Sequence, residues 1–332
     1  MDVLPRRAFV LLALSGCLPR SGRADERSVA EREGRPLPAA GPGSRSAGAK
    51  SGKRKRSKGD PPPHVTSDDV VAPTAESLEA RAEALRERYG PHGFSVTVEA
   101  PFVVLGDQGP DELRRRSEGT IRWAVQRLQQ DYFRVPPRDI VEVWLFGDDD
   151  SYRKHARAIF DDDPDTPYGY FTPRHQALIM NISTGGGTLV HELVHPFIDS
   201  DFPKCPSWFN EGLASLYEQC RDHEGHIWGL TNWRLAGLQE AIDAGRLPSF
   251  STLMSTTRDE FYDEDPGSNY AQARYLCYAL QERGLLRSFY RDYRRDVASD
   301  PTGQATLRAH VGDDLVAFQR EWERWVMTLR YG

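Results

Sequence analysis

The sequence predicts an α+β fold, in which a small mixed sheet packs on helices and a mainly helical second lobe follows. Short apolar segments typical of strands recur between residues 94 and 182, and they alternate with a long segment of helical periodicity. From residue 188 onward, apolar residues recur at three- and four-residue spacing in most segments. Residues 74–332 are numerous enough to bury a substantial core, and no internal repeat divides them.

The N-terminal lobe is expected over residues 73–187. Its first helix ends at Gly90-Pro91, and Pro101 divides the next apolar stretch into two strands because proline cannot donate to a sheet ladder. The acidic run that begins at Asp148 indicates the N-terminus of a further helix. We expect helices at 75–89 and 112–133, strands within 94–105 and at 140–146, and a strand pair at 168–172 and 176–182.

The second lobe, residues 188–332, is expected to contain the metal-site helices and then further helices. Apolar periodicity places these at 233–244, 269–284, 285–295 and 315–329. The rows of arginine and glutamate on them are expected to be solvated faces. Together the two lobes would form one catalytic domain, 73–332.

The motif His191-Glu192-Leu193-Val194-His195 is the main candidate for chemistry. Histidines four residues apart lie on one face of a helix, so both can bind one metal ion. A catalytic zinc ion needs a third protein ligand and an open position. Glu211 is our candidate for that ligand, on a second helix for which Ser207 is the expected N-cap. The alternative is a hydrogen-bonded histidine pair in the core.

The segments HELVH (191–195) and WFNEGLA (208–214) resemble the gluzincin zinc metallopeptidases of the peptidase MA clan, and within it the small, often lipoprotein-borne bacterial families. The resemblance, weaker over residues 93–329, implies a zincin-like fold and hydrolysis of a peptide or protein substrate. It implies one Zn²⁺ ion bound by His191, His195 and Glu211, with Glu192 as general base. It further implies that Tyr270 stabilises the oxyanion, although a core tyrosine is an equal alternative. The strand at about 178–181 would receive the extended substrate.

Two features depart from the family pattern. Pro196 follows the second histidine, so the helix is expected to end or kink there, or the site is altered. Asp201 is a rival third ligand, but position 198 is isoleucine and not the glycine that the corresponding metzincin turn requires. Pro196 is the main support for an alternative function, a non-catalytic cell-envelope lipoprotein with a decayed or structural zinc site that acts as a binding module.

The first residues resemble a bacterial export signal. Arg6 and Arg7 precede a short apolar run, and Leu14-Ser15-Gly16-Cys17 resembles a lipobox, which implies a signal peptide at 1–16 and a lipid on Cys17. A tether is expected at 17–72, with a net charge of plus seven between residues 18 and 60, whereas residues 61–332 carry minus fourteen. We therefore expect a lipid-anchored protein of the bacterial cell envelope, periplasmic or on the outer membrane, that binds no nucleic acid. The sequence leaves its oligomeric state open.

Cysteine positions suggest one disulfide. Cys205 and Cys220 flank the helix that carries Glu211, and a bridge between them in an oxidising compartment would hold that helix in place.

Overall fold

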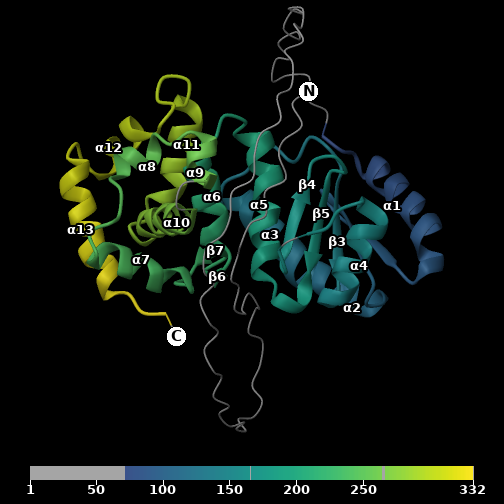
Figure 1. The fold of residues 1–332 in the computed structure, drawn as a ribbon. Coiled ribbons are helices and arrows are strands. Elements are labelled where there is room, and N and C mark those ends of the chain that lie inside the picture. Colours follow the sequence, from purple (N-terminus) through teal and green to yellow (C-terminus); the bar gives the residue numbers. More distant parts are fainter. Residues whose placement is uncertain (1–71, 165, 264–265, 332) are drawn as a thin grey trace, which may run out of the picture. The chain divides into compact units, whose positions relative to one another are not determined.

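The computed structural model describes residues 72–164, 166–263 and 266–331 (Figure 1). The predicted signal peptide, Cys17 and the tether up to residue 71 lie outside these ranges. Helices and one mixed five-stranded sheet make up most of the described chain, which confirms the α+β prediction. None of the described helices combines the length and the apolar composition needed to cross a bilayer.

The sheet has the strand order β1-β2-β3-β5-β4. Its central strands run parallel, and they are β2 (Phe102–Gly106), β3 (Val141–Phe146) and β5 (Ala177–Asn181). The edge strands β1 (Ser95–Glu99) and β4 (Gly169–Thr172) pair antiparallel with β2 and β5. Every residue of the three central strands is buried, as expected for parallel strands that are covered on both faces.

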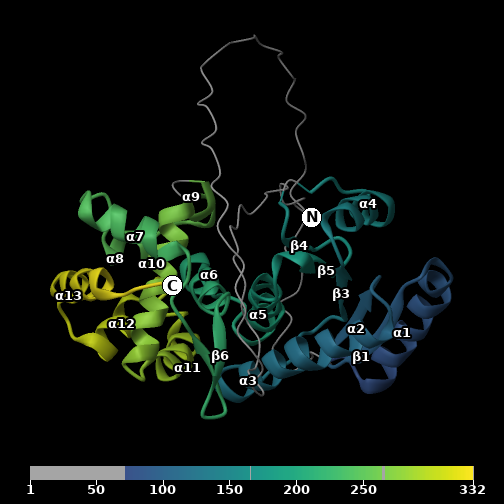
Figure 2. The same cartoon turned by 90° about the horizontal axis from the view of Figure 1, so that it is seen from below.

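Helices cover both faces of the sheet (Figures 1 and 2). On one face, α1 (Ala75–Tyr89) and α4 (Asp149–Phe160) pack against a cluster that includes Trp144. On the other face, Val143 belongs to the cluster that includes α2 (Pro110–Arg116), η3 (Ser117–Arg122) and α3 (Trp123–Asp131). Together, α2, η3 and α3 correspond to the predicted helix at 112–133. Helix α4 confirms the helix start predicted at the acidic run, because the Asp148 side chain caps the N-terminus of α4.

The chain after the sheet is mainly helical. The predicted helices at 233–244, 269–284, 285–295 and 315–329 correspond to α7, α10, α11 and α13, whereas the β6–β7 hairpin, α8, α9 and α12 are not predicted by the sequence. The bounds are α5 (Gly187–Asp201), α6 (Ser207–Leu216), β6 (Cys220–His223), β7 (His226–Gly229), α7 (Arg234–Asp243), α8 (Phe250–Met254), α9 (Arg258–Asp263), α10 (Pro266–Glu282), α11 (Leu286–Asp296), α12 (Gln304–Val311) and α13 (Leu315–Thr328). Short 3-10 turns η2 (Gly90–His92) and η4 (Ile182–Thr184) precede β1 and α5.

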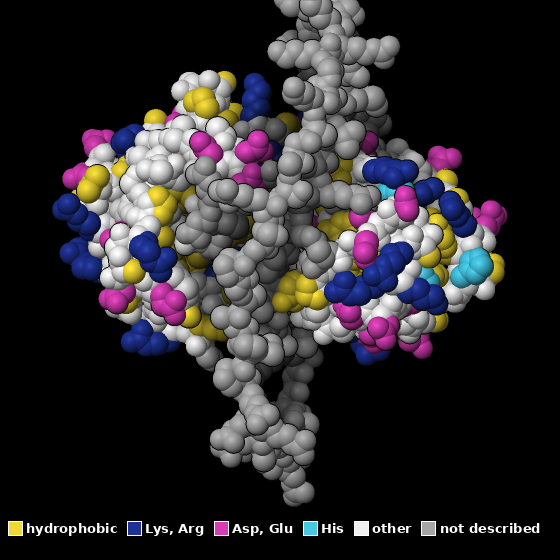
Figure 3. All heavy atoms as spheres, viewed as in Figure 1, with side chains coloured by type: hydrophobic (Ala, Val, Ile, Leu, Met, Phe, Trp, Pro, Cys, Tyr) yellow, Lys and Arg dark blue, Asp and Glu magenta, His cyan; other side chains and the backbone are white. Residues whose placement is uncertain are grey.

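One hydrophobic core runs from the inner face of the sheet through α5 and α6 to α13. Helix α5 lies between the sheet and the later helices (Figures 1 and 2), so both of its sides are covered by protein. On the face seen in Figure 3, positively and negatively charged side chains are mixed over both halves of the described chain. Helix α5, which carries the histidine motif, is therefore a buried element between the sheet and the later helices.

Candidate metal centre

Helix α5 begins at a position where only glycine fits. A Cβ on Gly187 would lie 2.1 Å from the backbone oxygen of Glu218, so a larger residue would push the helix away from the chain that follows α6. Gly212 has a similar role on α6, since a Cβ there would lie 2.9 Å from the backbone oxygen of Ala273 in α10. The two glycines therefore allow close packing around both motif helices.

Of the alternatives left open at Pro196, the structure excludes an end of the helix. Helix α5 continues through this proline to Asp201. The proline has no N–H for the carbonyl of Glu192, but it does not separate the two histidines. The ring centroids of His191 and His195 lie 4.9 Å apart, as expected for residues one turn apart on the same helix face.

Glu211 brings a carboxylate oxygen to both histidine rings. Its Oε2 lies 3.4 Å from Nε2 of His191 and 3.9 Å from Nε2 of His195. Glu211 and His191 are buried, and His195 is partly exposed. The structure therefore brings together the three side chains that the sequence singles out as metal ligands, and one of them borders solvent.

Glu192 lies beside this group. One candidate ligand atom from each of His191, Glu192 and His195 lies within 4.8 Å of the other two. Burial raises the pKa of Glu192, and the two neighbouring histidines oppose the effect without cancelling it. A carboxyl group with a raised pKa beside two imidazoles has the property that a general base near neutral pH requires.

Charges in this buried group affect one another strongly. Burial lowers the pKa of His191, but the nearby carboxylates of Glu211 and Glu218 outweigh burial and raise it to about 10. Burial raises the pKa of Glu211, but the charges of His195 and His191 lower it to about 2. The carboxylates thus create a negative potential that favours a cation at the imidazoles.

Asn210 orients the second histidine. Its Oδ1 lies 2.9 Å from Nδ1 of His195, and a proton on that nitrogen leaves Nε2 as the ring's lone-pair donor. Asn210 is not among the site residues that the sequence predicts. Its position directly before Glu211 could have indicated a role, because adjacent residues at the start of a helix can contact the same neighbouring helix.

Glu218 lies behind the first histidine. Its Oε1 is 3.4 Å from Nδ1 of His191, on the side of the ring away from Glu211. Arg234 donates two hydrogen bonds to this carboxylate, at 3.0 and 2.8 Å, and the Asn232 amide donates a third at 2.9 Å. Burial raises the pKa of Glu218, but Arg234 and His191 lower it to about 2, so this carboxylate is a buried anion. Sequence reasoning missed both Glu218 and Arg234.

Two tyrosines lie near Glu211. The Tyr262 hydroxyl donates a hydrogen bond of 2.6 Å to Oε1 of Glu211. Tyr270, which the resemblance suggests for the oxyanion, is buried, and its ring centroid lies 6.2 Å from that of Tyr262. Burial, and next the charge of Glu211, raise the pKa of Tyr270. The resemblance suggests a role for Tyr270 and none for Tyr262, although Tyr262 has the direct contact with Glu211.

Asp201, the rival ligand, is fully engaged elsewhere. Its Oδ1 accepts hydrogen bonds from the backbone N–H groups of Arg134 and Val135, and its Oδ2 accepts one from the Tyr290 hydroxyl. The carboxylate therefore connects α5 to the segment after α3 and to α11. The preference for Glu211 over Asp201 agrees with this geometry.

Three further expectations need correction. The strand at 178–181 cannot receive a peptide backbone, because β5 is paired on both sides, with β3 and β4. Cys205 and Cys220 are free thiols, so the predicted bridge between them is absent from the described residues. Ser207 is the first residue of α6, and Pro206 occupies the N-cap position.

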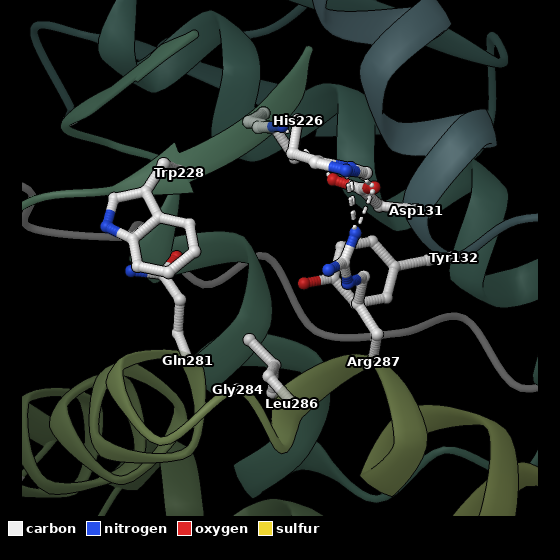
Figure 4. Close-up of a pocket in the computed structure, with 9 residues that line it drawn as sticks. Asp131, Tyr132, His226, Trp228, Gln281, Gly284, Leu286 and Arg287 are labelled. Atoms are coloured by element: carbon white, nitrogen blue, oxygen red, sulfur yellow. Dashed lines mark hydrogen bonds and ion pairs between the residues drawn. The ribbon is translucent and has the colours of Figure 1, made fainter. Parts of the chain in front are cut away.

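A second charged cluster centres on Asp131, at the end of α3 (Figure 4). Its Oδ1 lies 2.5 Å from Nδ1 of His226 and 3.2 Å from the Arg287 guanidinium, and its Oδ2 accepts a hydrogen bond from the Ile227 N–H. These residues line a surface pocket. Because both oxygens of Asp131 are engaged, we interpret this cluster as a junction between α3, the β6–β7 hairpin and α11.

No family model matches the chain, and a search of curated proteins finds no match for it. The chemistry of the candidate centre is accordingly inferred from its own side chains.

Proposed function

We propose that this protein is a zinc-dependent peptidase with a gluzincin-like site on a zincin-like fold. The observation that carries the proposal is the position of Oε2 of Glu211. This oxygen is buried, accepts no hydrogen bond from the described residues, and faces the Nε2 atoms of His191 and His195. A buried carboxylate oxygen that accepts no hydrogen bond costs free energy, and a cation held between it and the two rings would remove that cost.

The donor atoms fit a zinc ion. Zinc is typically bound tetrahedrally at about 2.0–2.1 Å from nitrogen and oxygen, so two of its ligand atoms lie about 3.3 Å apart. The Oε2 of Glu211 is 3.4 Å from one histidine nitrogen and 3.9 Å from the other, which requires only a small contraction. Two imidazoles and one carboxylate are also the ligand set of catalytic zinc sites with one open position.

A zinc ion bound there would supply a Lewis acid that acidifies water and polarises a carbonyl group. The chain's own residues would move the protons. Glu192 would take a proton from water as its oxygen adds to the scissile carbonyl carbon, and would pass that proton to the amide nitrogen as the C–N bond breaks. We retain Tyr270 as the candidate donor to the oxyanion, supported by its burial and its place beside Tyr262.

Strand β4 is our proposed binding edge for the substrate. Among the described strands it pairs with β5 alone, so the outer edge of Gly169–Thr172 has no strand partner. Helix α5 packs against β4, so this strand lies close to the helix that carries the histidines. An extended peptide can add to such an edge through main-chain hydrogen bonds.

We further propose that the enzyme acts in the bacterial cell envelope, held by a lipid on Cys17. The support is the lipobox-like sequence alone. Metabolic labelling with a radioactive fatty acid should label the expressed chain, and Cys17→Ser should remove the label. An unlabelled wild-type chain would contradict the anchor and leave the proposed chemistry in place.

The activity is tested with the full-length protein in detergent. The zinc content is measured by atomic absorption, and a mixture of unrelated peptides is incubated with and without a chelator. We expect about one zinc ion per chain and new peptide termini that appear only without the chelator and return on addition of zinc. Bound zinc without any cleavage would favour the non-catalytic envelope protein, and a chain that binds no zinc would reject the site itself.

A further inference from the structure

The two oxygens of the Glu211 carboxylate have different surroundings. Oε2 faces the histidine nitrogens, whereas Oε1 lies 2.6 Å from the Tyr262 hydroxyl. A hydroxyl donor this close to a carboxylate oxygen forms one of the stronger hydrogen bonds found in proteins. The protein thus occupies one oxygen itself and directs the other toward the proposed metal position.

Neighbouring side chains hold the Tyr262 ring in place. Its centroid lies 5.4 Å from that of Phe261 and 6.2 Å from that of Tyr270. On α9, the Arg258 guanidinium carbon lies 5.4 Å from the centroid of the Tyr262 ring. Burial, and next the charge of Glu211, raise the pKa of Tyr262, so its hydroxyl remains protonated and acts as the donor.

We propose that Tyr262 is a positioning residue that makes Glu211 a metal ligand through one oxygen only. This inference rests on the proposed zinc site. A carboxylate can bind a metal ion through one oxygen or through both, and the second mode would fill the position that a catalytic site keeps open for water and substrate. The Tyr262 hydrogen bond disfavours the second mode because it occupies Oε1 and fixes the plane of the carboxylate.

A matched control exists in the same chain. The Tyr290 hydroxyl donates a hydrogen bond of 2.7 Å to Oδ2 of Asp201, a buried carboxylate on α5. Tyr290→Phe therefore removes the same kind of bond as Tyr262→Phe, but from a carboxylate that does not face the histidine nitrogens. A general loss of stability would appear in both variants, whereas a change at the metal would appear only in the Tyr262 variant.

The test compares metal binding by the full-length wild type and the two variants. Zinc affinity is measured by competition with a chelator, and the visible absorption of the Co²⁺-substituted protein reports the coordination number. We expect Tyr262→Phe to weaken zinc binding about ten- to a hundredfold. Its cobalt absorption should decrease, because five-coordinate Co²⁺ absorbs less strongly than four-coordinate Co²⁺, and Tyr290→Phe should match the wild type in both measurements.

A second variant covers the case in which Tyr262→Phe does not fold. Tyr262→Ala leaves space for a small aromatic compound, and p-cresol should restore zinc affinity and the cobalt spectrum, whereas toluene, which lacks the hydroxyl, should not. Wild-type affinity and an unchanged spectrum in Tyr262→Phe would overturn the inference while leaving the zinc site intact. A wild-type chain that binds no metal would overturn the proposed function as well, so the two failures are distinguishable.

Discussion

The side-chain oxygen of Asn210 lies 2.9 Å from Nδ1 of His195, and Asn210 directly precedes Glu211 in the sequence. One turn of α6 therefore provides both a candidate ligand and the group that orients a neighbouring ligand. Each of the three candidate ligands has such a partner, since Glu218 lies behind His191 and Tyr262 contacts Glu211. Partners of this kind fix the ring orientation and the tautomer, and their loss typically weakens metal binding.

Asn210→Ala should weaken zinc binding about ten- to a hundredfold, because the His195 ring would lose the acceptor that fixes its orientation. Asn210→Asp should retain most of the affinity, because a carboxylate can accept the same hydrogen bond. Chelator competition measures both. Equal affinities in the wild type and Asn210→Ala would show that the helix alone orients the ring.

The buried pair of Glu218 and Arg234 gives a prediction about stability. Their side chains are 7% and 5% exposed, so replacing either one leaves an unpaired charge in the interior. We expect Glu218→Gln and Arg234→Met each to lower the free energy of unfolding by about 3–5 kcal/mol. The double variant should lose less than the sum of the two single losses.

Urea denaturation of the metal-free protein measures these changes. The pair Arg283–Glu321 is a suitable control, since its N···O distance is also 2.8 Å but its side chains are 37% and 59% exposed. Its removal should cost no more than about 1 kcal/mol. Additive losses in the buried pair would indicate that the two side chains act independently.

How much of the site the sequence predicts depends on how local each contact is. His191 and His195 are predictable because four-residue spacing on a helix fixes their relative position. The Glu211 contact with His191 follows from a motif resemblance, since the nineteen intervening residues do not determine where a second helix lies. Tyr262 is 51 residues beyond Glu211, and no local pattern indicates their hydrogen bond.

The fold shows the same limit. Successive residues of a strand face opposite sides of a sheet, so the predicted strand at 140–146 already separates Val143 from Trp144, as the structure shows. Periodicity says nothing about strand order, however. The pairing of β5 with β4 was predicted, but the sequence does not reveal that β3 occupies the other edge of β5. The proposed disulfide fails for a related reason, because the sequence predicts the helix between Cys205 and Cys220 but does not determine where the two thiols lie in the fold.

Glu192→Gln separates catalysis from metal binding. The amide has nearly the same size as the carboxylate but cannot accept the proton, so peptide hydrolysis should fall by about 10²–10⁴-fold or more. Zinc content should remain close to that of the wild type, because Glu192 is not one of the proposed ligands. His191→Ala should lose the metal itself. Full activity in Glu192→Gln would exclude Glu192 as the general base.

The charges around His191 give a prediction for the effect of pH. Its pKa is raised to about 10, above the usual 6.5, so its stabilising contribution in the metal-free protein is complete below pH 6.5 and is lost as the pH rises through 10. Glu211 and Glu218 have pKa values lowered to about 2, so their contributions are present above pH 4.5 and are lost as the pH falls through 2. The three groups together stabilise the metal-free protein most between pH 4.5 and 6.5.

Zinc affinity should increase with pH above 6.5, whereas the stabilising contribution of His191 to the metal-free protein decreases. The proton on His191 must leave before its nitrogen can bind a metal ion, so zinc affinity should rise about tenfold per pH unit between pH 6.5 and 8.5. Chelator competition across this range measures the slope, and a pH-stat should detect about one proton released per zinc ion bound. The zinc-induced increase in Tm should grow over the same range. A pH-independent affinity would mean that His191 is already neutral, and that the carboxylates of Glu211 and Glu218 do not hold a proton on its ring.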